Sequence, residues 1–268
     1  MTMYLLKLFR PVAVIATIFV LCLALVTSSH ALTIFHNGAP VASDDFESDT
    51  VGAHPSGWNP KDGKGESANV VVADSGPSAA EGSNYLILNR ANNSGSDGRA
   101  YLGFAEITSG EVSADFSLYV PSTNVVSVTN SSEGNIGLGP NMAGGLYLGL
   151  GQKNASGPST IDYYDAATSA WVNSGLTYAY DTWQRVTMAV NEDTGDASLS
   201  IDGTSASFNI GRTDFAVSRL EIEGGFAGGA GPPHNQLFVD AVPEPTSLGL
   251  AGIALLACVA GLNAFRRR

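Results

Sequence analysis

The sequence predicts an all-β protein, a two-sheet antiparallel sandwich formed by residues 32–242 and flanked by two apolar end segments. Within residues 42–242, short runs of alternating apolar and polar residues are separated by clusters of Gly, Asn, Asp and Ser. No stretch of this region has the 3.6-residue period of a helix. We therefore expect three parts: residues 1–31, residues 32–242 and residues 243–268.

The first part has the features of a signal peptide. Two basic residues form a cationic start, an apolar run over 12–26 follows, and Ser29 and Ala31 supply the small residues that signal peptidase requires. We expect a signal helix that signal peptidase cleaves after Ala31. An uncleaved membrane anchor is the alternative interpretation.

The nine strand predictions of the middle part come from alternation and from turn residues. The clearest is 111–120, which places Val112, Ala114, Phe116, Leu118 and Val120 on one face. Residues 183–190 and 197–202 form a predicted hairpin, because the loop between them is rich in Gly, Asn and Asp. The other predicted strands are 69–74, 85–89, 146–150, 161–164, 220–223 and 237–242.

The last part resembles the membrane-spanning end of a sorted protein. Pro243, Glu244 and Pro245 are followed by an apolar stretch over 248–265 and by three arginines, Arg266, Arg267 and Arg268. As a helix this stretch reaches about 27 Å, close to the thickness of a bilayer core. Because basic residues stay cytoplasmic, the middle part is expected across the membrane from the arginines. A plain single-span anchor is the alternative.

These three features in this order resemble the PEP-CTERM sorting signal. The resemblance implies an exosortase as the processing partner, export across the inner membrane, and transient anchoring through a transmembrane sorting helix. The mature protein would then reach the cell surface or the extracellular matrix. The two prolines keep the segment around Glu244 extended and accessible to a processing enzyme.

The middle part resembles the concanavalin A-like lectin/glucanase superfamily, of the laminin-G-like kind. The segments that carry the resemblance, in chain order, are Asp45-Phe46-Glu47, Pro55-Ser56-Gly57-Trp58, Asp181-Thr182-Trp183, Asp193-Thr194-Gly195, Ile201-Asp202-Gly203 and the closing strand 237–241. The resemblance implies a jelly roll whose first and last strands are adjacent.

Charge and cysteine content exclude several classes of function. The formal net charge is −12, and all acidic residues except Glu244 lie in the middle part, so a nucleic-acid partner is not expected. The two cysteines, Cys22 and Cys258, lie in the end segments. The middle part therefore has no disulfide, no thiolate metal site and no cysteine nucleophile.

The sequence predicts no catalytic site. The superfamily's glycanases carry a Glu-x-Asp-x-Glu motif, which this chain lacks; the nearest segment, Glu221-Ile222-Glu223, is interpreted as the solvent face of a strand. The histidines stand apart from one another, and no Gly-x-Ser-x-Gly elbow occurs. The glycine-rich segments 134–139 and 224–231 are interpreted as loops. We expect a protein that is not an enzyme.

Two groups of residues are candidate binding sites. If the terminal strands pair, Asp45 and Glu47 would meet Asp240 and offer the oxygen ligands of one structural Ca²⁺, with Asp44 nearby. The alternative is that these charges protect a sheet edge from aggregation. No other cofactor is expected.

The second group is aromatic and would bind carbohydrate. Tyr147, Tyr163 and Trp171, with Tyr164, could stack on sugar rings, while Asp162 could accept hydrogen bonds from hydroxyls, as could Asp165 and Asn173. The alternative is that these aromatic residues belong to the core, to which Trp58 and Trp183 are assigned outright.

Together these observations predict a non-catalytic surface or extracellular-matrix protein, exported and processed by an exosortase. It would bind exopolysaccharide or serve a structural role, for example in a biofilm. A glycoside hydrolase or lyase of the concanavalin A-like superfamily is one alternative. A membrane-tethered adhesin that binds protein is the other.

Overall fold

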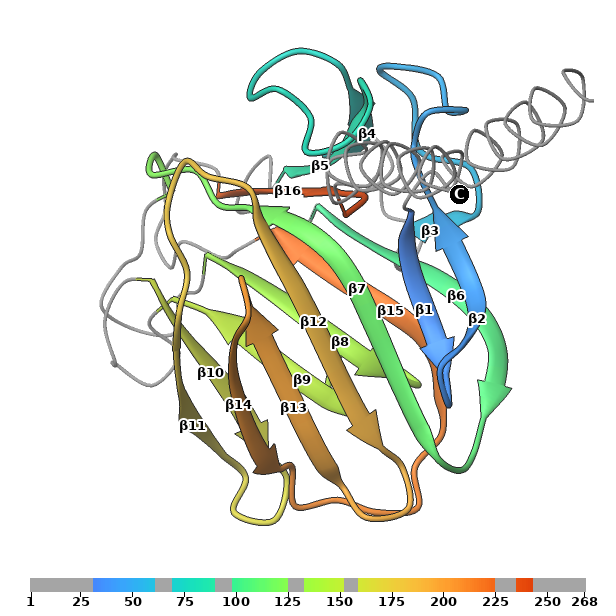
Figure 1. Ribbon diagram of the computed structural model, residues 1–268, viewed down its shortest axis with the longest axis vertical. Coiled ribbons are helices and arrows are strands. Elements are labelled where there is room, and N and C mark those ends of the chain that lie inside the picture. Colours follow the sequence, from blue (N-terminus) through green and yellow to red (C-terminus); the bar gives the residue numbers. More distant parts are fainter. Residues whose placement is uncertain are drawn as a thin grey trace, which may run out of the picture. The chain divides into compact units, whose positions relative to one another are not determined.

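The computed structural model describes residues 31–60, 69–89, 98–124, 133–151, 159–224 and 235–242. Residues 31–242 form one compact unit. Within the described residues this unit contains two antiparallel sheets and no helix, and the sheets lie one over the other as two layers (Figure 1). The predicted all-β sandwich is thereby confirmed.

The nine-stranded sheet has the order β14-β13-β12-β7-β16-β5-β4, with β1 paired to β7 and β2 paired to β1. Its strands are β1 (Leu32–His36), β2 (Ala39–Asp44), β4 (Val70–Ala73), β5 (Tyr85–Asn89), β7 (Glu111–Tyr119), β12 (Gln184–Asn191), β13 (Asp196–Ile201), β14 (Thr204–Asn209) and β16 (Gln236–Asp240).

The seven-stranded sheet has the order β11-β10-β9-β8-β15-β6-β3. Its strands are β3 (Trp58–Pro60), β6 (Arg99–Ile107), β8 (Gly134–Gly139), β9 (Leu146–Leu150), β10 (Thr160–Asp165), β11 (Ala170–Thr177) and β15 (Val217–Gly224).

The core lies between the two sheets and follows the period of two along each strand. On β7 the apolar face predicted from the sequence is buried, with Ala114 and Phe116 fully inaccessible. The predicted hairpin is also confirmed, since Met188 of β12 pairs with Leu199 of β13 in the expected register. The seven-stranded sheet contributes apolar residues such as Leu220 and Ile222 from β15.

Two tight hairpins depend on residues that tolerate a positive φ. Asn37-Gly38 joins β1 to β2 with φ angles of 48° and 80°, and Asp202-Gly203 joins β13 to β14 with 47° and 83°. Positive φ at both central residues defines the turn type that matches the twist of paired strands. These dipeptides therefore set the register of both hairpins.

The prediction that 134–139 is a loop is wrong, because this segment is strand β8 and is buried throughout. Its glycines are needed because neighbouring groups approach closely. A Cβ on Gly137 would lie 2.6 Å from the carbonyl oxygen of Met142, which folds back over the strand. Alternation was hidden here because three of the six residues are glycines, whose side chain is only a hydrogen.

The first and last strands are not paired with each other, contrary to the arrangement that the resemblance implied. Both β1 and β16 pair with β7, β1 along residues 112–115 and β16 along 117–119. They therefore lie one after the other beside the same strand. This corrects the strand pairing on which the calcium prediction was based.

Trp58 belongs to the main core as expected, whereas Trp183 does not. Trp183 lies in a second aromatic cluster with Tyr85, Tyr119 and Phe238, on the outer face of the nine-stranded sheet. A hydrogen bond holds the segment 74–84 against this cluster: Trp183 Nε1 donates to the carbonyl of Ser78 over 2.6 Å. The cluster is thus an outer apolar layer under a connecting segment.

Helices long and apolar enough to cross a membrane are absent from the part of the chain that the structure describes. The predicted signal helix and the predicted transmembrane sorting helix, including residues 243–268, lie outside the described residues.

Candidate functional site

The candidate site is the outer face of the seven-stranded sheet. Because alternate residues point to opposite faces, the core positions Leu220 and Ile222 of β15 send Arg219, Glu221 and Glu223 outward. The strand registers extend this face across the sheet: Tyr101 of β6 pairs with Glu221, and Tyr164 of β10 pairs with Trp171 of β11. The outward residues are Asn59, Arg99, Tyr101, Asn135, Tyr147, Asp162, Tyr164, Trp171, Asn173, Arg219, Glu221 and Glu223.

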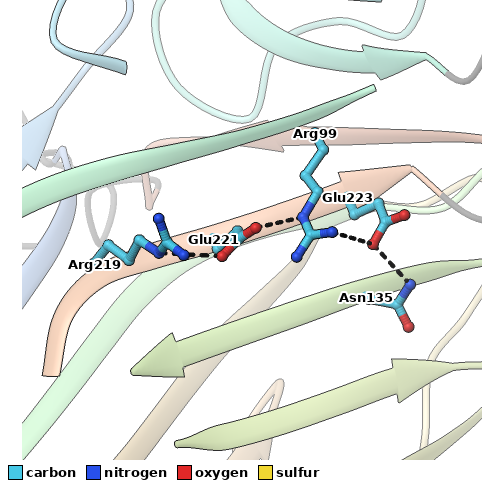
Figure 2. Close-up of polar contacts among 5 residues, drawn as sticks. All are labelled: Arg99, Asn135, Arg219, Glu221 and Glu223. Carbon is cyan, nitrogen blue, oxygen red and sulfur yellow. Dashed lines mark hydrogen bonds and ion pairs between the residues drawn. The ribbon is translucent and has the colours of Figure 1, made fainter. Parts of the chain in front are cut away.

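One half of this face carries a charged cluster, defined as Arg99, Arg219, Glu221, Glu223 and Asn135 (Figure 2). Glu221 lies between the two arginines: Arg99 Nε donates a hydrogen bond to its Oε1, and Arg219 Nε lies 3.2 Å from its Oε2 without hydrogen-bond alignment. Glu223 Oε2 lies 3.9 Å from Arg99 Nη1 and accepts a 3.3 Å hydrogen bond from Asn135 Nδ2. The four charges therefore compensate one another.

The charged cluster is buried, which corrects the prediction of a solvent face. Glu221 is fully inaccessible, and the side chains of Arg99 and Arg219 are only 14% and 19% exposed. The guanidinium carbon of Arg219 also lies 4.6 Å from the centre of the Tyr101 ring, a cation–π contact. Buried charges are costly unless paired, so the arginines are the partners that allow the glutamates at these positions.

The other half of the face carries an aromatic cluster, defined as Tyr147, Tyr164 and Trp171. The rings of Tyr147 and Trp171 have centres 4.7 Å apart, and those of Tyr164 and Trp171 are 5.6 Å apart, all with tilted or edge-on geometry. Asp162 is fully buried beside them and accepts a 3.2 Å hydrogen bond from Asn173 Nδ2. Five of the predicted sugar-binding residues therefore share one face: Tyr147, Tyr164, Trp171, Asp162 and Asn173.

Tyr163 does not belong to this group. It points to the inner face of the sheet and stacks on Phe208 of β14, with ring centres 4.0 Å apart and planes 13° apart. The neighbouring Tyr164 takes the outward position instead. Asp165 is likewise absent from the face, because it caps a turn by accepting hydrogen bonds from Ala167 and Thr168.

Tyr147 links the two clusters electrostatically. Burial, together with the smaller effect of the Glu223 charge, raises the pKa of its phenol to about 12, while Arg99 opposes the shift. The phenol therefore keeps its proton and can donate a hydrogen bond. Gly137 lies between Tyr147 and Glu221 in the register, and the buried Met142 covers it.

The carboxylates of the predicted calcium site serve another purpose in the fold. Asp240 Oδ2 accepts hydrogen bonds from the amides of Ala80 and Glu81, and Glu47 Oε1 accepts two from Ser83 and Asn84. Asp45 caps its own turn by accepting a bond from the Glu47 amide. Among the described residues no group of three or more His, Cys, Asp or Glu is placed to hold a metal ion.

The remaining predicted residues concern sorting rather than binding. Ala31 directly precedes β1, and its carbonyl accepts a 2.9 Å hydrogen bond from the Thr33 hydroxyl. Pro243, Glu244, Pro245 and the three terminal arginines lie outside the described residues.

Sequence reasoning missed the arginines of the charged cluster and Asn135. A signal existed: Arg219, Glu221 and Glu223 alternate with apolar residues, so they had to share one face. What the pattern could not supply was the approach of Arg99 from β6 and Asn135 from β8, which depends on strand order.

Comparison with known families identifies the C-terminal segment. Residues 241–268 match the family model described as the PEP-CTERM protein-sorting motif. The chain carries a PEP-CTERM sorting motif. This motif implies processing by an exosortase and indicates export, with a membrane-anchored sorting signal at the C-terminus. No curated protein sequence matches the chain.

The chain is similar to several solved structures, all at low sequence identity. A sialidase superposes with a TM-score of 0.52 at 11% identity, covering 79% of this chain, which spans 18% of the sialidase's length. The cellulose-induced protein Cip1 has a TM-score of 0.48 at 16% identity, with 75% of this chain and 94% of that chain covered. A Bacteroides ovatus mixed-linkage glucan GH16 protein has 0.42 at 14% identity, covering 74% and 96%. The sandwich is thus a two-sheet antiparallel jelly roll, a fold that it shares with part of the sialidase.

Proposed function

We propose that the chain is a non-catalytic protein of the cell surface or extracellular matrix, whose jelly roll binds polysaccharide through the outer face of its seven-stranded sheet. The supporting observation is the gathering of Tyr147, Tyr164 and Trp171 on the same face as a row of amide and carboxylate groups. Half-buried rings offer an apolar surface to the CH groups of a sugar, and polar neighbours bind its hydroxyls. Exosortase processing of the tail delivers this domain outside the cell.

The main rival is a glycoside hydrolase or lyase that uses Glu221 and Glu223. The two glutamates stand two residues apart on one strand, so their points of attachment to the backbone are about 6.8 Å apart. This spacing suits a pair of catalytic carboxylates. However, Glu221 is fully buried between Arg99 and Arg219, so it is not free to contact a glycosidic oxygen. We therefore favour binding without cleavage.

The aromatic cluster provides the direct test. The variant Trp171→Ala should lose retention on an exopolysaccharide matrix prepared from the host, because its ring supplies the stacking surface. A matched control is Phe35→Ala, an aromatic residue on the outer face of the nine-stranded sheet, which should bind like the parent. Equal retention of both variants would rule out this face as the binding site.

Two further measurements separate the proposal from its rivals. Reducing ends released from the same matrix by the parent protein, and lost in Glu221→Gln, would establish a hydrolase instead. Intact mass of the native protein from its host should show the N-terminus at Leu32 and a processed tail. An intact mass that corresponds to the chain with both termini uncleaved would contradict signal cleavage and sorting.

A further inference from the structure

The charges on the binding face limit which polysaccharides it can accept. Within the described residues, the charged groups in and beside the two clusters on this face are Arg99, Arg219, Glu221, Glu223 and Asp162. Both cations are already engaged by the two glutamates. The other two arginines in the described part of the chain are also engaged: Arg185 pairs with Asp115 on the opposite sheet, and Arg212 donates to the backbone carbonyls of Ala143 and Gly144.

An anionic sugar would have to compete for these arginines. A uronate or sulfate group that drew Arg99 or Arg219 away would leave Glu221 buried with only one of its two partners. Breaking a buried ion pair in this way is strongly unfavourable. Asp162, fully buried beside the aromatic cluster, adds a further negative charge. Among the described residues of this face, a carboxylate on the ligand therefore finds no unpaired arginine and meets the negative charge of Asp162.

This face is also poorly suited to bind a cationic sugar. Glu221 is inaccessible and Glu223 is held by Arg99 and Asn135, so neither carboxylate can approach an ammonium group freely. Asp162 is fully buried and accepts a hydrogen bond from Asn173. Neutral partners with exposed surface remain: the amides of Asn59 and Asn173 and the un-ionised phenol of Tyr147, which suit hydroxyl groups.

The extent of the face indicates a polymer rather than a single sugar. The aromatic cluster lies on β9, β10 and β11, whereas the charged cluster lies on β6, β8 and β15. Five strand spacings separate β6 from β11, a distance of about 24 Å. A ligand that spans both clusters from β6 to β11 must therefore cross all six of these strands.

Given the proposed polysaccharide binding, we infer that the ligand is an uncharged polysaccharide chain lying across the strands of the seven-stranded sheet. In this arrangement the compensated charged cluster is the element that rejects acidic glycans, and the aromatic cluster supplies stacking. The specificity thus resides in the pairing of Arg99 and Arg219 with the glutamates rather than in a free charge.

The test compares glycans that differ in charge, with the full-length chain in a neutral detergent. Probes are two soluble neutral polysaccharides, a β-glucan and a mannan, and two acidic ones, alginate and dextran sulfate, measured by affinity gel electrophoresis and thermophoresis. We expect a neutral probe to bind at least about tenfold more tightly than either acidic probe, the equivalent of about 1.4 kcal/mol. That affinity should hold between about 0.05 and 0.5 M salt, because no ligand charge is screened.

A variant probes the mechanism of rejection. Glu221→Gln removes the carboxylate that holds both arginines, so binding of alginate should increase by about tenfold or more, with new sensitivity to salt. The matched control Asp115→Asn frees Arg185 on the other sheet and should leave alginate binding unchanged. Thermal unfolding of both variants checks that they remain folded.

The possible outcomes are distinct. Tighter, salt-sensitive binding of alginate or dextran sulfate by the parent would overturn this inference while leaving the proposed function intact. Unchanged alginate binding in a folded Glu221→Gln variant would overturn the role of the charged cluster. Failure of all four probes to bind would overturn the proposed function and this inference with it.

Discussion

Removing Arg99 should destabilise the protein far more than removing an arginine from an exposed ion pair. Arg99 contacts both Glu221 and Glu223, and its side chain is only 14% exposed. In the variant Arg99→Met, Glu221 keeps Arg219 alone and Glu223 keeps the hydrogen bond from Asn135. The substitution preserves much of the apolar volume, so the loss is mainly electrostatic.

Breaking a buried ion pair costs about 3–5 kcal/mol when one partner is removed. Because Arg219 still pairs with Glu221, we expect the lower end of this range, about 3 kcal/mol of unfolding free energy. The control is Arg185→Met, whose partner is Asp115 and whose side chain is 57% exposed. An exposed pair contributes about 0–1 kcal/mol.

Urea unfolding of the full-length chain, followed by tryptophan fluorescence, measures both changes. All three tryptophans, Trp58, Trp171 and Trp183, lie in the compact unit, so the signal reports on the sandwich. A double-mutant cycle with Glu221→Gln should give a coupling energy of about 1–3 kcal/mol. If Arg99→Met loses no more stability than Arg185→Met, the charged cluster is not the buried network described above.

Stability should increase as the pH falls from 8 to 5. Burial raises the pKa of Asp44 to about 6 and those of Glu192 and Asp240 to about 7, so the folded state binds protons that unfolded carboxyls have lost. A melting temperature that drops as the pH falls over this interval would contradict the expectation. The variant Asp240→Asn should make the melting temperature less dependent on pH. Gly137→Ala should cost about 1–3 kcal/mol through overlap with the backbone of Met142, whereas Gly103→Ala, with only ordinary contacts, should be nearly neutral by urea unfolding. Calcium and EDTA should leave the melting temperature unchanged, because the predicted ligands already accept amide hydrogen bonds. A melting temperature lowered by EDTA would instead support the predicted calcium site.

The sequence by itself determined the fold class, the sorting tail and much of the strand pattern. The alternation of apolar and polar residues could be recognised wherever one face of a strand carries large apolar residues, as on β7 and in the β12–β13 hairpin. The PEP-CTERM motif could be recognised because its parts follow one another in the chain: prolines, an apolar stretch and arginines. Strand β8 was missed because glycine leaves no alternation to detect.

Only the tertiary structure decided the candidate site. The sequence left open whether Tyr147 and Trp171 point outward or into the core, and the choice of Tyr164 over Tyr163 depended on which face of β10 meets the core. Burial of Glu221 depended on Arg99 arriving from β6, which lies 122 residues away in the chain. A strand's own pattern specifies which residues share a face. Which strands flank it, and therefore which charges meet, is settled only when the sheet assembles.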